Sequence, residues 1–490
     1  MTRTLLLLHR YLGIGLSLLL VLWCLSGFVM MYAQYPELTD DEQLRGLAEL
    51  RLEECCAWPD DFSDIDLERF RIEMLADRPV IRLDANFGTF TLDLARGLYL
   101  DEFDATSAAR LAADAAARFG LGTNPRYRGA VTLDQWTVGA GLGRHQPLYR
   151  FSADDPAGTE FYLSSTTGEV VQMTTARERF WGWLGPVVHW IYPTMLRRHV
   201  SVWIQTIIWT TLLGLFLTAI GIYVGISQLK RRRNGSLSPY RGMKLWHHYA
   251  GLLFGVLTLT WLFSGLLSVT PWGTFEGRSF ATEARRIHGQ TLRLEHAQNL
   301  LADFPTAALP DRTVRLEGEM FNGRVYLGAL TASGQRLRLD GETYAPSPLT
   351  KPALDAVAAK LRPAAELVGH NWLSQEDAYY YSHHIERRLP VYRIQYADGE
   401  RIYLDGSTGQ LSFAVDADRR KSRWLFLALH RGDFAAAVRQ RPVWDIMMWA
   451  LLLGVTAGAV TGAWLGVQRM ARAVRRYRRR YEPTPTTHTR

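Results

Sequence analysis

Two long apolar segments of this chain begin with the same residue pattern, and each pattern carries a histidine. His9-x-Tyr11-x-Gly13 in the first half recurs as His247-x-Tyr249-x-Gly251 in the second. Leu25-Ser26-Gly27 recurs with the same offset as Phe263-Ser264-Gly265. A second set of positions repeats with a slightly larger offset: Trp183, His189, Trp203, Gly221 and Gly225 match Trp424, His430, Trp444, Gly462 and Gly466. The chain therefore consists of two similar halves, each with two histidines at matching positions.

Four segments are apolar enough to cross a membrane. They lie near 11–33, 202–226, 249–270 and 443–467, and each is close to the roughly 20 residues that span the hydrocarbon core. The first is too long for a signal peptide and no small-x-small cleavage pattern follows it, so we expect it to remain as an anchor. The sequence thus predicts a membrane protein, a four-transmembrane-helix bundle built from two parallel repeats. Two extracytoplasmic α+β domains would connect the helices.

The net charge of +8 is concentrated at the ends of the spans. Lys230–Arg233, Arg241 and Lys244 lie between the second and third spans, and seven arginines lie between positions 469 and 480. Short basic segments mark the cytoplasmic side of a membrane, so both termini are expected in the cytoplasm. These basic residues lie beside the ends of membrane spans, and the lipid bilayer accounts for them there. No nucleic acid is expected as a partner.

These features predict a division of the chain into eight parts. They are a first helix at 1–33, an outer domain at 34–180, an aromatic outer-face segment with the second helix at 181–229, a basic loop at 230–246, a third helix at 247–270, a second outer domain at 271–422, an outer-face segment with the fourth helix at 423–468, and a basic tail at 469–490. Within the outer domains we expect helices at 107–119 and 353–361, and strands at 148–151, 160–163, 391–396 and 401–404. Thr-Gly turns end both domains, and the tail 483–490 has a disordered composition.

His9 and His247, which we call the inner pair, are expected at the same depth near the cytoplasmic face. Facing helices of a bundle can supply ligands to both sides of a cofactor. Gly13 and Gly251 stand one helical turn after their histidines, so they share a helix face with them and leave room for a planar ring. A single histidine at such a depth can be a simple boundary residue. Recurrence together with the glycine argues against that alternative.

His189 and His430, which we call the outer pair, precede the second and fourth spans. Arginines follow them in each half, namely Arg197, Arg198, Arg439 and Arg441. Guanidinium groups pair well with carboxylates such as haem propionates, and contact with lipid phosphates is the alternative. The two pairs predict two haem b groups, with the iron of each held by two axial histidines. Such haems suit electron transfer because no ligand position stays open.

Two further histidines are spare candidates for haem ligands. His248 neighbours His247, but the repeat register favours His247 because His248 corresponds to Arg10. His199 has no counterpart in the second half, where Gln440 stands.

Three cysteines give no disulfide framework and no Cys-x-x-Cys-His motif for covalent haem attachment. Cys24 is expected to pack within the first span. Cys55 and Cys56 are adjacent, and a bridge between neighbours needs unusual backbone geometry, so we assign them no redox role.

An aromatic and imidazole-rich run, Tyr379 to His384, stands in the second outer domain. Its Tyr381, His383 and His384 could contact an iron chelate or another electron acceptor. A strand with alternating buried side chains is the alternative interpretation.

Four groups of motifs, which together cover nearly the whole chain, carry a family resemblance. They are His9-Arg10-Tyr11-Leu12-Gly13 with Leu25-Ser26-Gly27, Asp377 to His384 leading into Leu389-Pro390-Val391-Tyr392-Arg393, Tyr403-Leu404-Asp405 with Thr408-Gly409, and Arg423-Trp424-Leu425-Phe426 with Leu429-His430-Arg431. With them the chain resembles the bacterial membrane proteins that have PepSY domains and PepSY-associated transmembrane helices. The resemblance implies PepSY-like outer domains and a multi-pass protein of the bacterial inner membrane linked to iron uptake.

One branch of that family is similar to ferric-siderophore reductases with two b-type haems in four helices. The resemblance therefore implies an enzyme, a ferric-chelate (siderophore) reductase acting at the periplasmic face. The chain has no recognisable flavin or nicotinamide motif, so an external donor, a quinol or a flavoprotein, would supply electrons. The alternative is a non-enzymatic, membrane-anchored PepSY protein that regulates or recruits a periplasmic partner. A transporter is disfavoured because charged or broken mid-membrane segments are not evident.

Overall fold

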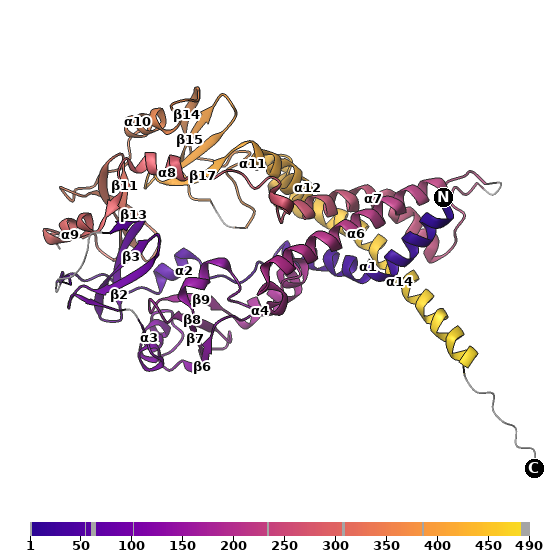
Figure 1. Cartoon of the computed structure of the whole chain (residues 1–490), viewed down its shortest axis with the longest axis horizontal. Helices are drawn as coiled ribbons and strands as arrows, with labels where there is room; N and C mark the ends of the chain where they lie inside the picture. Colours follow the sequence, from indigo (N-terminus) through magenta and orange to yellow (C-terminus); the bar gives the residue numbers. More distant parts are fainter. Residues whose placement is uncertain are drawn as a thin grey trace, which may run out of the picture. The chain divides into compact units, whose positions relative to one another are not determined.

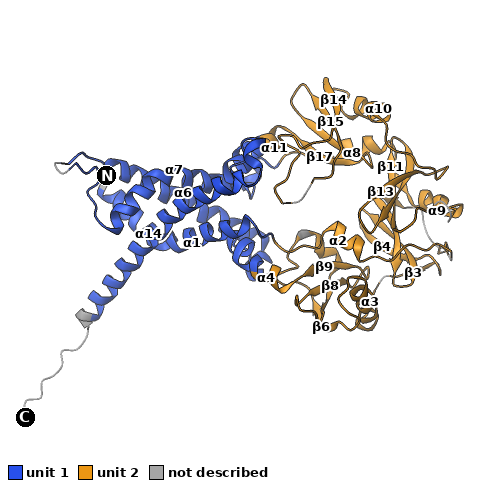
Figure 2. Cartoon of the chain, turned by 180° about the vertical axis from the view of Figure 1, so that it is seen from behind, with its two compact units in different colours: residues 1–34, 181–276, 421–490 blue, residues 35–180, 277–420 orange. Residues whose placement is uncertain are grey.

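The computed structural model describes residues 2–53, 55–59, 65–100, 102–232, 235–305, 309–384 and 387–481. Arg233 and the tail at 483–490, on which two of the sequence expectations fall, lie outside these ranges. The chain separates into two compact units, drawn in different colours in Figure 2. Unit 1 comprises 1–34, 181–276 and 421–490, and unit 2 comprises 35–180 and 277–420.

Unit 1 contains four long apolar helices that lie side by side (Figure 1). They are α1 (Thr2–Met30), α6 (Val200–Ser227), α7 (Met243–Leu267) and α14 (Val443–Tyr481). All four are long and apolar enough to cross a membrane, as the sequence predicts. Large apolar side chains such as Leu18, Trp209 and Leu253 are exposed on them, which suits contact with lipid tails. Since α1 and α7 each pack against both α6 and α14, α1 and α7 occupy opposite corners of the bundle.

Short helices precede α6 and α14, and each series includes a π-helical turn. Before α6 come α4 (Ala176–Gly182), the π-turn η2 (Trp183–Val187) and α5 (Thr194–Arg197). Before α14 come α11 (Ala417–Ser422), the π-turn η5 (Arg423–Ala428), α12 (Leu429–Arg431) and α13 (Ala436–Arg439). π-Helical turns are rare and are frequent at functional sites. In this chain both stand just before a histidine of the outer pair.

Unit 2 contains one four-stranded antiparallel sheet from each half of the chain. The first consists of β6 (Arg126–Val131), β7 (Leu148–Ser152), β8 (Glu160–Ser164) and β9 (Val170–Thr174), and α3 (Ala105–Arg118) packs on it. The second consists of β14 (Leu367–Leu373), β15 (Val391–Tyr396), β16 (Arg401–Asp405) and β17 (Leu411–Val415), and α10 (Lys351–Leu361) packs on it. The helices and strands expected from the sequence are present. Each Thr-Gly turn leads into one further strand, β9 or β17.

A seven-stranded sheet joins the two segments of unit 2. The first segment supplies β2 (Arg69–Leu75), β3 (Arg78–Ala85), β4 (Gly88–Asp93) and β5 (Leu98–Tyr99), and the second supplies β11 (Thr313–Phe321), β12 (Arg324–Thr331) and β13 (Arg336–Asp340). β2 and β11 pair antiparallel, with Ile72 opposite Leu316. The sequence predicts two separate outer domains, 34–180 and 271–422, and does not predict a strand pairing between them. Alone, β2 and β11 would each leave a row of unpaired backbone groups, and their pairing satisfies both rows.

The remaining elements connect these sheets and helices. They are α2 (Asp40–Arg45), β1 (Asp66–Leu67) paired with β10 (Leu292–Arg293), η1 (Ala140–His145), η3 (Pro271–Gly273), α8 (Ala281–His288) and α9 (Leu294–Ala302). Cys24 is buried and not bridged. Cys55 and Cys56 form a disulfide across a cis peptide bond, a pairing that their adjacency in the sequence disfavours.

Candidate functional site

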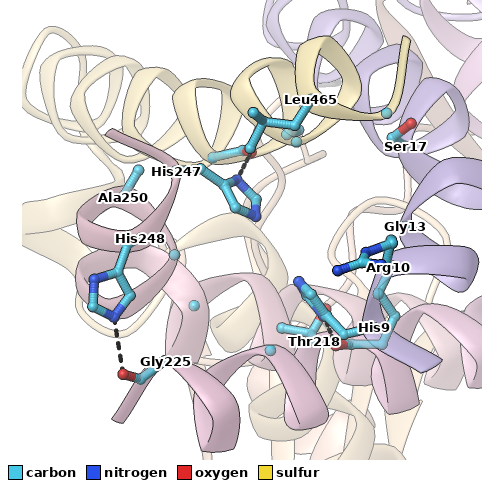
Figure 3. A pocket seen from close by; sticks show the side chains of 18 of the residues that line it. His9, Arg10, Gly13, Ser17, Thr218, Gly225, His247, His248, Ala250 and Leu465 are labelled. Atoms are coloured by element: carbon cyan, nitrogen blue, oxygen red, sulfur yellow. Dashed lines mark hydrogen bonds between the residues drawn. The ribbon is translucent and has the colours of Figure 1, made fainter. Parts of the chain in front are cut away.

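The inner pair meets between opposite corners of the bundle. His9 on α1 and His247 on α7 point into the same space (Figure 3), with ring centroids 6.2 Å apart and ring planes tilted by 34°. His9 Nδ1 lies 3.1 Å from the Leu217 carbonyl oxygen of α6, and His247 Nδ1 lies 3.2 Å from the Gly458 carbonyl oxygen of α14. A carbonyl oxygen can only accept, so both Nδ1 atoms carry the ring proton. Each Nε2 therefore keeps its lone pair.

A cavity of about 410 Å³ surrounds the inner pair. Gly13 and Gly251, the glycines expected to leave room for a planar ring, both line it. Other small residues line it as well: Ser17, Gly221, Gly225, Gly255, Gly458 and Gly462. Each of the four helices contributes small residues to the cavity, and a Cβ at Gly251 or Gly458 would meet no atom within 4 Å. Such a lining suits a flat apolar ligand.

Two glycines that the sequence repeats lie directly beside the inner histidines. A Cβ at Gly221 of α6 would come 2.6 Å from Cε1 of His9, and one at Gly462 of α14 would come 3.1 Å from Cε1 of His247. Both distances are shorter than ordinary carbon contacts. The second repeat offset identified these glycines as a matched pair, but their partners become apparent only from the packing of the helices.

Four cations also line the cavity: Arg10, Lys244, Arg469 and Arg472. No Asp or Glu is among its described lining residues, so the cavity combines apolar walls with positive charge. Such a combination suits an apolar ligand that carries carboxylates. Of these cations, Lys244, Arg469 and Arg472 belong to the basic segments that the sequence relates to membrane orientation, and their position around the cavity becomes apparent only from the packing of the helices.

The outer pair meets at the opposite ends of α1 and α7. His189 and His430 have ring centroids 6.1 Å apart, with ring planes inclined by 74°. His189 Nδ1 lies 3.1 Å from Ser26 Oγ, and His430 Nδ1 lies 3.1 Å from Ser264 Oγ. Among the described residues, no hydrogen bond reaches Nε2 of any of the four paired histidines. In both pairs, Nδ1 is bonded to the protein and Nε2 keeps a lone pair that can bind a metal ion.

Both outer histidines are neutral at physiological pH. Burial lowers the pKa of His189 to about 4. Burial, and then the nearby His189 and Arg431, lower the pKa of His430 to about 3. A neutral imidazole is the form that binds a metal ion.

The two pairs are separated along the helices by the same spacing in each half. His9 and Ser26 on α1 are as far apart in the sequence as His247 and Ser264 on α7. At 1.5 Å per residue this separation corresponds to about 25 Å, close to the roughly 30 Å thickness of the hydrocarbon core. One site therefore lies near each end of the bundle.

Each pair alone offers only two protein ligands. The described residues contain no group of three or more His, Cys, Asp or Glu side chains that could hold a metal ion. A metal ion at either pair would need its other ligands from a cofactor. A haem, whose ring nitrogens surround the iron and whose axial positions histidines fill, meets this requirement.

His248 is occupied elsewhere. Its Nδ1 lies 2.7 Å from Ser238 Oγ and its Nε2 lies 2.9 Å from the Gly225 carbonyl oxygen, so both nitrogens have protein partners. Figure 3 shows its ring turned toward Gly225 and away from the space between His9 and His247. His199, the other spare candidate, is exposed at the start of α6.

The outer arginines of the first half differ from each other in their surroundings. The guanidinium carbon of Arg197 lies 5.1 Å from the centre of the Tyr192 ring and 4.9 Å from that of Trp203, a cation–π arrangement. Arg198 is exposed. Of these two, Arg198 is the more available to a propionate or a lipid phosphate.

The outer arginines of the second half contact the protein. Arg439 Nε lies 3.6 Å from Oδ1 of the buried Asp433. Arg441 donates to the Met31 carbonyl oxygen at 2.8 Å. The Arg439 contact links two parts of the segment before α14, and the Arg441 contact attaches that segment to the end of α1. Both contacts leave less of each guanidinium for a ligand.

The three residues considered for acceptor binding lie between β14 and β15 in unit 2. Tyr381 is buried, His383 is half-buried and His384 is exposed. Their rings follow one another, with centroids 6.0 Å apart for Tyr381 and His383 and 6.3 Å apart for His383 and His384. The exposed end of this series is the part that a soluble acceptor could reach.

Comparison with known families agrees with the resemblance seen in the sequence. The chain matches the family model described as "PepSY-associated TM region" over residues 6–469, a range that includes both histidine pairs. No curated protein matches the chain closely. With four helices able to cross a membrane and a match over most of its length, this chain belongs to the PepSY-associated TM region family of membrane proteins.

Proposed function

We propose that this chain is a dihaem b-type electron-transfer protein of the bacterial inner membrane and that it reduces ferric chelates or ferric siderophores at the periplasmic face. Electrons would come from a quinol or a flavoprotein on the quinone or cytoplasmic side. The observation that carries the proposal is the arrangement of four histidines in two facing pairs, each with Nδ1 bonded to the protein and Nε2 left as a ligand.

The residues around the inner pair fit a haem. Apolar and glycine-rich walls accept a flat ring, and Arg10, Lys244, Arg469 and Arg472 stand where carboxylates can be paired. Haem with two axial imidazoles supplies one-electron transfer and leaves no position open for oxygen. These four cations, which we call the basic rim of the inner cavity, also agree with a cytoplasmic position of the inner pair, since short basic segments favour the cytoplasmic side.

The protein residues have three tasks in this proposal. The backbone carbonyls and serines hold the ring protons at Nδ1, the glycines set the distance of each imidazole from the neighbouring helix, and the apolar helices exclude water from the space between the sites. For the acceptor, we propose the surface at His384 with His383 and Tyr381 behind it, because an exposed imidazole can contact a soluble chelate.

Haem content of single variants tests the proposal. The full chain, purified after expression with added haem, should show a Soret band and two haems per chain. Alanine at His9, His247, His189 or His430 should remove one haem each. His248→Ala is a matched control, since this histidine neighbours a proposed ligand but has both nitrogens bonded elsewhere, and it should keep both haems.

Two results would contradict the proposal. A haem-supplied protein without Soret absorption would exclude the haem sites and favour a membrane-anchored regulator of a periplasmic partner. A reduced dihaem protein that no ferric chelate reoxidises would retain electron transfer and exclude ferric-chelate reduction. A panel of ferric chelates in stopped-flow measurements, followed at the reduced haem bands, distinguishes these cases.

A further inference from the structure

We propose that Ser26 and Ser264 are positioning residues for the outer histidine pair, each fixing the tautomer and the direction of one imidazole. This inference rests on the proposed haem function and concerns only the outer site. Both serines are almost fully buried, with 1% and 0% of their surface exposed. A buried hydroxyl needs hydrogen-bond partners, and in each case the partners are one backbone carbonyl and one histidine.

The proton count determines the role of each hydroxyl. Ser26 Oγ donates to the Trp23 carbonyl oxygen at 3.1 Å and lies 3.1 Å from His189 Nδ1, so with its proton on Trp23 it accepts from Nδ1. Nδ1 of His189 then carries the ring proton, and Nε2 is the free nitrogen. His189 also has a backbone hydrogen bond to Trp23, and Ser26 is the side-chain partner of the same ring.

The second half has the same arrangement. Ser264 Oγ donates to the Trp261 carbonyl oxygen at 3.1 Å and lies 3.1 Å from His430 Nδ1. The glycine after each serine completes the support. A Cβ at Gly27 would lie 4.0 Å from Cε1 of His189, and one at Gly265 would lie 3.4 Å from Cε1 of His430. The repeated Ser-Gly dipeptide thus bonds to one side of an imidazole and leaves room for it.

Both pairs have backbone partners, and the outer pair adds two buried serines. The inner Nδ1 atoms face the backbone carbonyls of Leu217 and Gly458, with the Thr461 hydroxyl also beside His247. The outer histidines have backbone hydrogen bonds to Trp23 and Trp261, and each has in addition a serine hydroxyl that substitution can remove. Partners of this kind typically change metal affinity about 10- to 100-fold when lost. Removing both serines should therefore weaken one site and spare the other.

The test uses the full dihaem protein with Ser26→Ala, Ser264→Ala and the double variant. Haem transfer to an excess of apomyoglobin gives the release rate of each haem. Electron paramagnetic resonance of the oxidised protein gives the ligand field of each haem, with the outer signal assigned by its loss in His189→Ala. We expect the double variant to release the outer haem about 10 to 100 times faster, with a shifted outer signal and an unchanged inner signal.

Two further variants separate positioning from general damage. Ser26→Thr with Ser264→Thr keeps the hydroxyls and should restore release rate and signal. Ser268→Ala is the matched control, because Ser268 stands one turn beyond Ser264, at the C-terminal cap of α7, and donates to the Gly265 carbonyl oxygen at 2.6 Å. It should behave as wild type.

The outcomes distinguish failure of haem binding from failure of the serine role. A wild-type protein that binds no haem overturns the proposed function itself. A wild-type protein with two haems, whose double alanine variant keeps the outer release rate and signal, overturns the role of the serines alone. Equal changes at both haems would also overturn it, since they would indicate a general loosening of the bundle.

Discussion

Gly221 of α6 lies against the ring of His9, so close that a Cβ at position 221 would come 2.6 Å from Cε1 of the imidazole. Gly221→Ala must therefore displace the ring or the helix. We expect this variant to lose most of the inner haem, and Gly462→Ala, with 3.1 Å to His247, to lose less. Haem content and release rate of the purified variants measure the effect.

The matched control for this prediction is Gly15→Ala on α1. A Cβ there would meet no atom within 4 Å, and Gly15 does not line the cavity, so both haems should stay. If Gly221→Ala kept a full complement of inner haem, the His9 ring would not lie against Gly221 in the haem-loaded protein.

The two haems should be distinguishable by electron paramagnetic resonance. The ring planes of the outer pair are inclined by 74° and those of the inner pair by 34°. Near-perpendicular axial imidazoles give a highly anisotropic low-spin ferric signal, whereas more parallel ones give a rhombic signal. We expect one signal of each kind, with the anisotropic one absent from His430→Ala and the rhombic one absent from His247→Ala. Two identical signals would contradict the ring orientations described above.

The basic rim of the inner cavity should hold the inner haem through charge. We expect glutamine at Arg10 or Arg469, both of which line the cavity, to speed inner haem release about two- to five-fold each, the effect of about 0.5–1 kcal/mol for an exposed pair. The effect should shrink at high salt because exposed pairs are screened. Apomyoglobin transfer at low and high ionic strength provides the measurement.

Arg475→Gln and Arg476→Gln serve as controls for the rim. These arginines lie further along α14 and do not line the cavity. Acceleration by these variants equal to that of the rim variants would indicate a general effect of charge near the membrane.

Glu319 on β11 should make unit 2 less stable as the pH rises. Burial raises the pKa of Glu319, Arg336 and Arg338 lower it, Glu317 and Asp405 raise it, and the net pKa is about 7. Between about pH 4.5 and pH 7 the folded state keeps a proton that the unfolded state has lost, so the free energy of unfolding falls across this window. The loss is on the order of 1–3 kcal/mol, at about 1.4 kcal/mol per pH unit.

Thermal unfolding of the full chain in detergent, followed by circular dichroism, tests this dependence. The loss of strand signal should occur at a lower temperature at pH 7.5 than at pH 5.5 in the wild type. The difference should be smaller in Glu319→Gln, which cannot titrate. An equal difference in both proteins would place the pH dependence elsewhere.

Much of the candidate site could be predicted from the sequence because it repeats. The two repeat offsets paired His9 with His247 and His189 with His430, and both pairs lie together in the structure. The spans were predictable because a run of about twenty apolar residues has few other uses.

The partners of the histidines were not predictable. The carbonyls of Leu217 and Gly458 leave no mark in a sequence, because every residue type supplies one. Ser26 and Ser264 were visible within the repeated motif, but their contact with the outer pair depends on how the segments before α6 and α14 fold back.

The sheets were predictable only within each half. The two strands of a hairpin are close in the sequence, so the alternation of apolar and polar residues and the turn residues between them identify the pair. Buried charges weaken that signal in the seven-stranded sheet, where Arg82 and Glu73 pair at 2.6 Å with 1% of each side chain exposed. The pairing of β2 with β11 joins strands from opposite halves of the chain. Other strands also have edges that could accept β2, and the sequence does not distinguish between them.

The pairing of β2 with β11 also has a consequence for the two halves of the chain. With these strands as neighbours, a row of backbone hydrogen bonds joins the first and second segments of unit 2. Either half expressed alone would expose an open strand edge, a template for aggregation. Once joined, the halves are free to differ at matched positions, as Thr461 beside His247 and Ile220 in the other half already do. A homodimer of one half could not give the two histidines of one pair different neighbours in this way.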